Sequence, residues 1–232
     1  MRKRITAMVM LLILCISMAV PALAAPPYRS YTYDAYGMAV PSPSPYTYDT
    51  EINGSKYGIG DFKDPQDMFI DKEYYIYVLD TGNNRVVIFD ENKNLVRVIS
   101  DMKYKGKTVT LKDAQGIFVY EYYDKKYLYI ADTGNGQILR LDLLNELTGK
   151  NVNAPITIDK LFPDPKISEI DTKARYQPAK LIVDRAERMF VLCISVNRGV
   201  VKLTKDGEYE SFFGAPDVTY TAIEAFWRMI ST

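Results

Sequence analysis

The side chains that are candidates for binding a metal ion or a ligand lie in two copies of the tetrapeptide Asp-Thr-Gly-Asn. They occupy residues 80–83 and 132–135, each between two apolar runs. Carboxylate and amide oxygens are the ligands that calcium prefers in proteins, so an acidic motif repeated in this way could form a metal or ligand site. The same residues also make a turn, in which the Asp accepts from backbone N–H groups two residues on and the Gly adopts a positive φ. Because the motif repeats together with its flanking strands, we favour the turn.

The residues that follow the motif differ between the copies. Arg85 follows the first copy, where it could pair with an acidic residue and bridge to the adjacent repeat, and Gln137 replaces it in the second. The corresponding stretch of a third, more degenerate repeat is Ser195-Val-Asn197-Arg198, which lacks the acid. The candidate residues for a binding loop or a turn motif are therefore Asp80, Thr81, Gly82, Asn83, Arg85, Asp132, Thr133, Gly134 and Asn135.

The composition excludes several classes of enzyme. The 232 residues include no histidine, which rules out an imidazole acid or base and a histidine-bound zinc. The sequence contains no Gly-x-Ser-x-Gly elbow, phosphate-binding loop or Cys-x-x-Cys pair. A calcium-dependent hydrolase needs only oxygen ligands, which Asp67 and the two motifs supply, but the third repeat adds no obvious partner. We assign no catalytic, cofactor-binding or metal-binding residue.

The two motifs belong to a longer repeat. Residues 62–71 are echoed by residues 111–120, residues 76–90 are echoed by residues 128–142, and a third copy begins at Gln177. Each copy reads as four short apolar strands separated by turns rich in Gly, Asn and Asp. A repeat of about 40 to 50 residues with four strands is typical of one propeller blade.

We therefore predict an all-β fold, a partial β-propeller of about three four-stranded antiparallel blades. Two tyrosine-rich pieces around a proline-rich turn, residues 30–34 and 46–49, predict an N-terminal β-ribbon. Thr221-Ala-Ile-Glu224 forms a capping box before apolar residues at helical spacing, which predicts a short amphipathic C-terminal helix. The predicted domains are a signal peptide at 1–24, a Tyr/Pro-rich segment at 25–61, a propeller region at 62–217 with blades at 62–100, 111–162 and 176–213, and the helix at 218–232.

The N-terminal residues predict where the protein is located relative to the cell. Residues 2–4 are basic, residues 5–20 are apolar and uncharged, and small residues stand at Ala22 and Ala24. This is the pattern of a secretory signal peptide cleaved after Ala24, and the apolar run is shorter than the ~20 residues of a membrane-spanning helix. We expect a protein that is secreted or held in the cell envelope, with no transmembrane segment after cleavage.

Charge and cysteine content limit the partners and the source of stability. The chain has 29 basic and 29 acidic residues, and cleavage removes three basic ones, so the mature net charge is 26 − 29 = −3. This balance gives no electrostatic reason to expect nucleic acid as a partner. Only Cys193 remains after cleavage, within an apolar run, and we expect a buried structural thiol and no disulfide.

Residues 65–90, with Pro65, Asp67 and the Asp-Thr-Gly-Asn-Asn-Arg stretch that starts at Asp80, resemble an NHL repeat. Residues 62–100 match that pattern closely, residues 111–142 match it well and residues 176–213 match it loosely. The resemblance implies a β-propeller, usually of six blades, in a family whose members bind proteins, ligands or RNA and whose relatives include lyases and lactonases. About three blades would be half of such a ring. The chain would then be truncated, pair with a second copy, or form an open array, and of these we expect a truncated propeller.

We expect an NHL-type propeller scaffold that binds a protein, peptide or glycan through loops on one face, without catalysis and without a cofactor. The alternative is a calcium-dependent hydrolase of the lactonase or esterase type. Nucleic acid is not an expected partner, and a homodimer is expected if the propeller closes between two chains.

Overall fold

The computed structural model describes residues 30–42, 49–149, 151–167, 175–194, 196 and 199–214. Its regular secondary structure, within these residues, consists of strands and short 3-10 turns, and the chain divides into two units, Met1–Glu51 and Ile52–Thr232. The predicted signal peptide and the predicted C-terminal helix lie outside the described residues. In the part of the chain that is described, no helix is long and apolar enough to cross a membrane.

The first unit contains a β-ribbon whose second strand is not the predicted one. Most of the predicted second strand, residues 46–48, lies outside the described residues. β1 (Tyr31–Tyr33) pairs antiparallel with β2 (Ala39–Pro41), so the turn begins at Asp34. The Asp34 carboxylate accepts hydrogen bonds from the backbone N–H groups of Tyr36 and Met38. This Asx-type turn closes the ribbon locally, before the proline-rich stretch at which the sequence predicts the turn.

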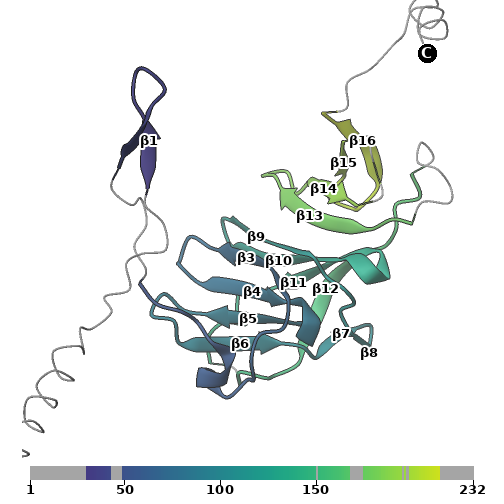
Figure 1. Ribbon diagram of the computed structural model, residues 1–232. Helices are drawn as coiled ribbons and strands as arrows, with labels where there is room; N and C mark the ends of the chain where they lie inside the picture. The colour runs from purple at the N-terminus through teal and green to yellow at the C-terminus, as the bar shows by residue number, and fades with distance from the viewer. Residues whose placement is uncertain are drawn as a thin grey trace, which may run out of the picture. The chain divides into compact units, whose positions relative to one another are not determined.

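The second unit contains three four-stranded antiparallel meanders, which we call blades 1, 2 and 3 (Figure 1). Within each blade, consecutive strands are hydrogen-bonded neighbours, which confirms the predicted all-β architecture of three blades. The strands of blade 1 are β3 (Pro65–Ile70), β4 (Ile76–Asp80), β5 (Arg85–Phe89) and β6 (Leu95–Ile99). Those of blade 2 are β9 (Gly116–Tyr122), β10 (Lys125–Asp132), β11 (Gln137–Asp142) and β12 (Ile156–Phe162). Those of blade 3 are β13 (Pro178–Val183), β14 (Met189–Cys193), β15 (Val200–Leu203) and β16 (Tyr209–Phe213).

One hairpin between blades 1 and 2 was not predicted. β7 (Met102–Tyr104) pairs antiparallel with β8 (Lys107–Val109), and β7 also pairs parallel with β12 through Met102 and Ile156. The hairpin therefore extends the sheet of blade 2 to six strands. Met102 is fully buried, and this apolar anchor holds the lysine-rich segment next to it against the sheet.

The core lies between the faces of neighbouring blades. One face of blade 1, with Tyr77, Leu79 and Ile88, packs against Leu128 and Ile130 of blade 2. The opposite face of blade 2 packs in the same way against blade 3. Each buried side chain of this size contributes about 1.5–3 kcal/mol to stability. Successive residues along the strands of blade 2 point to opposite faces, and both faces bury apolar side chains against a neighbouring blade. Blade 2 therefore joins the three blades.

Cys193 of β14 belongs to the core between blades 2 and 3. The expected buried thiol is confirmed, because the residue is almost completely shielded from solvent. Burial raises the pKa of this thiol to about 12, with a smaller contribution from Asp164. The thiol therefore remains protonated at neutral pH and is a packing group.

Candidate functional site

In the first two repeats the Asp of the motif is fully buried, and it connects the turn to the segment that precedes the first strand of the same blade. One oxygen of Asp80 accepts from the backbone N–H of Lys63 at 2.7 Å. The other accepts from the side chains of Asn83 at 2.8 Å and Arg85 at 2.7 Å. Asp132 repeats this pattern with Lys112, Asn135 and Gln137 at 2.8 Å each.

These contacts correct two details of the predicted turn. The carboxylates accept no hydrogen bond from the N–H groups two residues on, and they bind the preceding segment instead. The left-handed position is Asn84 in the first copy and Gly136 in the second, after the motif. Gly82 is required for another reason, since a Cβ there would lie 2.5 Å from the carbonyl oxygen of Lys63. Gly134 has the same relation to Lys112.

The threonine of each motif connects one blade to the next. Thr81 donates through its hydroxyl to the carbonyl oxygen of Ala114 at 2.6 Å, and Thr133 donates to that of Pro178 at 2.6 Å. Both acceptors precede or begin the first strand of the following blade. The motif therefore stabilises the junctions between blades as well as the turn within each blade.

We expect Thr133→Val to lower the free energy of unfolding by about 1–2 kcal/mol, because a buried carbonyl loses its donor. Urea unfolding followed by near-UV circular dichroism measures this change. Thr81→Val is the matched variant, and we expect a smaller loss because its site is only half-buried. Equal stability of Thr133→Val and the wild type would show that the hydroxyl does not stabilise the junction.

Arg85 does not bridge to the adjacent blade. Its guanidinium binds Asp80 and donates to the carbonyl oxygens of Ile59 at 2.5 Å and Gly60 at 3.2 Å, which precede blade 1. Arg85 and Asn83 also line an open hollow of about 570 Å³ together with that preceding segment. Asn83 and Arg85 thus border a hollow, while the carboxylates of Asp80 and Asp132 are buried.

A second hollow lies at the other end of the strands, where sequence analysis placed no site. The first strands of the blades, β3, β9 and β13, lie side by side. On β3, an oxygen of Asp67 accepts from the backbone N–H of Ile117 at 2.9 Å and lies 3.1 Å from the ammonium of Lys180. This carboxylate therefore touches both neighbouring first strands and fixes their spacing.

The ends of β3, β9 and β13 form an open cleft of about 480 Å³, to which all three blades contribute. Its walls combine aromatic rings with charged groups. Phe69 meets Phe118 edge to face at a ring distance of 5.3 Å, and the guanidinium of Arg185 lies 6.0 Å from the ring centre of Tyr122. The residues that characterise the cleft are Phe69, Phe118, Tyr120, Tyr122, Asp184 and Arg185.

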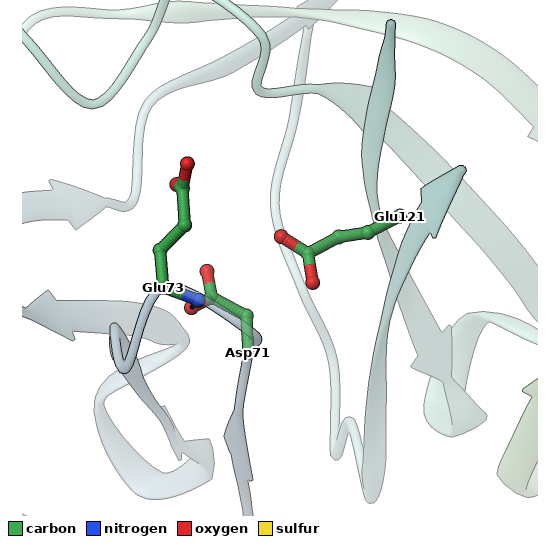
Figure 2. Close-up of side chains that lie close together, drawn as sticks. All are labelled: Asp71, Glu73 and Glu121. Atoms are coloured by element: carbon green, nitrogen blue, oxygen red, sulfur yellow. Dashed lines mark hydrogen bonds between the residues drawn. The ribbon is translucent and has the colours of Figure 1, made fainter. Parts of the chain in front are cut away.

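A cluster of carboxylates borders this cleft. Figure 2 shows Asp71 and Glu73 on one segment, with Glu121 on the strand that faces it. The ammonium of Lys126 lies 2.7 Å from Asp71, 2.8 Å from Glu73 and 3.2 Å from Glu121. It is also 4.9 Å from the ring centre of Tyr75. The lysine therefore supplies the positive charge that the buried Asp71 requires.

The cluster shifts two pKa values. Burial acts to lower the pKa of Lys126, but hydrogen bonds to Asp71 and Glu73 outweigh it, and the pKa is raised above its ordinary value. Burial, together with the hydrogen bond that its hydroxyl donates to Asp71, raises the pKa of Tyr77 far above its usual range. Lys126 is thus a cation and Tyr77 a neutral donor at any physiological pH.

The carboxylate oxygens that could bind calcium already accept hydrogen bonds or pair with cations of the same chain. Asp80 and Asp132 each accept three hydrogen bonds, and Asp67 joins the first strands of three blades. In the cluster of Asp71, Glu73 and Glu121, a metal ion would have to displace the ammonium of Lys126. This geometry fits a structural ion network, and it supplies no set of uncommitted ligands for calcium.

Sequence reasoning missed the cleft because its walls come from three separate repeats. The signal that could have located it is positional, since Asp71, Tyr120 and Asp184 are equivalent positions of the three repeats, at or near the end of each first strand. Polar and aromatic residues at the ends of equivalent strands meet when the repeats pack radially.

No family model matches the sequence, and a search of curated proteins found no match either. Among solved structures, the extracellular domain of a one-component system from B. thetaiotaomicron is similar over 64% of this chain and 18% of that chain, with 15% identity and a TM-score of 0.44. Hydrazine synthase from Kuenenia stuttgartiensis is similar over 73% and 40%, with 9% identity and a TM-score of 0.45. Virginiamycin B lyase from Staphylococcus aureus is similar over 81% and 64%, with 12% identity and a TM-score of 0.35. The chain thus spans less than two thirds of the length of each.

Proposed function

We propose that this chain is a secreted scaffold built from NHL-type propeller blades, which binds a protein, peptide or glycan ligand without catalysis. The cleft at the ends of β3, β9 and β13 is the proposed binding surface. The observation that carries the proposal is that three blades each contribute side chains to one hollow that is open to solvent.

The chemistry of the cleft supports recognition. Aromatic rings provide apolar contact area at little cost in side-chain entropy, and they stack on sugar rings or on apolar side chains of peptides. Arg185 and Asp184 add charged groups at the rim, where they can orient a ligand. The first strands beneath are fixed by Asp67 and by the junction threonines, so the surface is held in place before a ligand arrives.

The chemistry also supports binding without turnover. The carboxylates beside the cleft are paired with Lys126, and the thiol of Cys193 is buried and protonated. The chain contains no histidine. The cleft therefore has contact groups, but the side chains that face it do not include an activated nucleophile next to a base.

Screening the purified protein on glycan and peptide arrays, followed by titration of the best ligand, tests this proposal. We expect Tyr122→Ala to weaken binding by about tenfold, because the cleft loses one of its large aromatic contact surfaces. Tyr36→Ala is the control, because Tyr36 is an exposed tyrosine of the N-terminal ribbon. We expect that variant to bind with unchanged affinity.

Two outcomes would contradict the proposal. One is a ligand whose affinity falls in Tyr36→Ala and not in Tyr122→Ala, which would move recognition to the ribbon. The other is a ligand that the protein converts to a product, which would assign catalysis to the chain.

A further inference from the structure

The carboxylates in the wall of the cleft are already engaged by donors of the same chain. The three acids that line it are Asp71, Glu121 and Asp184. Both oxygens of Asp71 accept, from two backbone N–H groups, a tyrosine hydroxyl and the ammonium of Lys126. Those of Glu121 are held by a backbone N–H and by Lys126. Those of Asp184 are held by two backbone N–H groups and by the guanidinium four residues on. Glu73, the other acid beside Lys126, borders a different hollow. The wall therefore has little carboxylate surface left to accept from a ligand.

The two cations that line the cleft are the opposite case. Lys72 follows β3 and Arg185 follows β13, so they reach the end of β9 from the two neighbouring blades. The ammonium of Lys72 donates to the backbone carbonyl oxygen of Glu121 at 3.2 Å, and the guanidinium of Arg185 lies over the ring of Tyr122. Both residues are exposed, and no carboxylate of the described residues pairs with either cation. Their other N–H groups can therefore donate to a ligand.

Apart from its tyrosines, the rest of the wall is apolar. Phe69 and Phe118 are half-buried, meet edge to face and carry no polar side-chain atom, and Ile70 is 52% exposed. Such a surface fits an apolar side chain. A sugar presents hydroxyl groups that donate as well as accept, and the engaged carboxylates offer these hydroxyls few acceptors. Free cationic donors beside an apolar surface therefore favour an acidic peptide over a glycan.

We propose that the cleft binds an acidic peptide segment, in which a carboxylate pairs with Arg185 and a neighbouring apolar side chain packs on Phe69 and Phe118. A guanidinium holds a carboxylate through bidentate hydrogen bonds, and the ring of Tyr122 supports the guanidinium from the side of β9. Lys72 adds a second positive charge for an acidic ligand. This inference rests on the proposed function and names the class of ligand within it.

Titration of the purified protein with fluorescein-labelled peptides tests the inference. One set alternates glutamate with phenylalanine or leucine, and the matched set has glutamine in place of each glutamate. We expect the acidic set to bind about tenfold more tightly, because the amide set loses the charged hydrogen bonds.

Variants of the arginine assign this preference to the cleft. Arg185→Gln should remove it, and Arg185→Lys should retain part of it, since lysine keeps the charge without the planar fork. Lys103→Gln is the control, because Lys103 is an exposed cation of the β7–β8 hairpin and does not border the cleft. We expect that variant to keep the full preference.

Equal affinity for the acidic and the amide peptides, or a preference that Arg185→Gln leaves unchanged, would overturn the inference. So would an acidic glycan, tested as oligogalacturonate, that binds through Tyr122 while the peptides do not bind. In these cases the proposed function stands as long as Tyr122→Ala weakens binding. If Tyr122→Ala leaves the affinity of every tested ligand unchanged, the proposed function and the inference fail together.

Discussion

Gly116→Ala is expected to lower the free energy of unfolding by about 3 kcal/mol or more. Gly116 begins β9, and an added Cβ would lie 2.2 Å from the carbonyl oxygen of Ala179 and 3.1 Å from the Cα of Lys180. Both obstacles are backbone atoms of β13, so relief requires that the first strands of blades 2 and 3 move apart. Urea unfolding followed by near-UV circular dichroism measures the loss.

Gly106→Ala is the control for this variant. Gly106 has a φ of 79° and no atom within 4 Å of an added Cβ, so its substitution introduces backbone strain and no clash. The expected cost is about 1–2 kcal/mol. A loss for Gly116→Ala that is no larger than the loss for Gly106→Ala would mean that β9 and β13 do not approach as closely as described.

Lys126→Met is expected to destabilise the fold by about 3 kcal/mol at pH 7, because it leaves the buried carboxylate of Asp71 without its cation. Methionine preserves most of the length and apolar surface of the lysine stem, so the change mainly removes charge. Lys125→Met is the matched control, since Lys125 is the exposed neighbour and pairs with Glu187 at 2.5 Å. We expect a much smaller effect there. Equal losses in the two variants would contradict the stabilising role of the cluster.

The same cluster predicts a pH dependence. The pKa of Lys126 is raised in the folded state, so its contribution is complete below the unfolded value of about 10.4 and is lost as the pH rises towards the folded value. The raised pKa of Tyr77 acts in the same direction above about pH 10. Stability should therefore be level near neutrality and fall above pH 10, with a shallower fall in Lys126→Met. An equally steep fall in that variant would show that Lys126 does not cause it.

The blades could be predicted from the sequence because the information for them is local. Apolar strands of four to eight residues and turns rich in Gly, Asn and Asp recur at equivalent positions, such as residues 76–90 and 128–142. Each strand pairs with the next one along the chain. The β7–β8 hairpin could not be predicted in this way, because β7 joins β12, which is distant in sequence, and its segment is rich in lysine.

The motif residues were found, but their contacts were not. Asp80 was expected to bind within its own turn, and it binds the backbone of Lys63 instead. Gly82 was expected to have a positive φ, and it is needed because the backbone of Lys63 lies against it. Both contacts are made with Lys63, in the segment that precedes the first strand of the same blade. The tetrapeptide itself does not indicate them.

The cleft depends on packing between blades. Asp71 and Glu121 come from different repeats, and they approach each other only because the first strands lie side by side and Lys126 is inserted between them. The sequence shows each residue in its own strand or turn. Their proximity follows from the order of the blades, which is a tertiary property.

Hydrogen exchange of the protein with and without its array-selected ligand tests the central claim, that ligand binds at the ends of β3, β9 and β13. We predict slower exchange on binding in residues 69–72, 118–122 and 183–185, which border the cleft. Residues 58–61 and 83–85, which border the hollow beside Arg85, should exchange at an unchanged rate. Protection confined to the segments beside Arg85 would contradict the claim and would move recognition to the turns that contain the Asp-Thr-Gly-Asn motif.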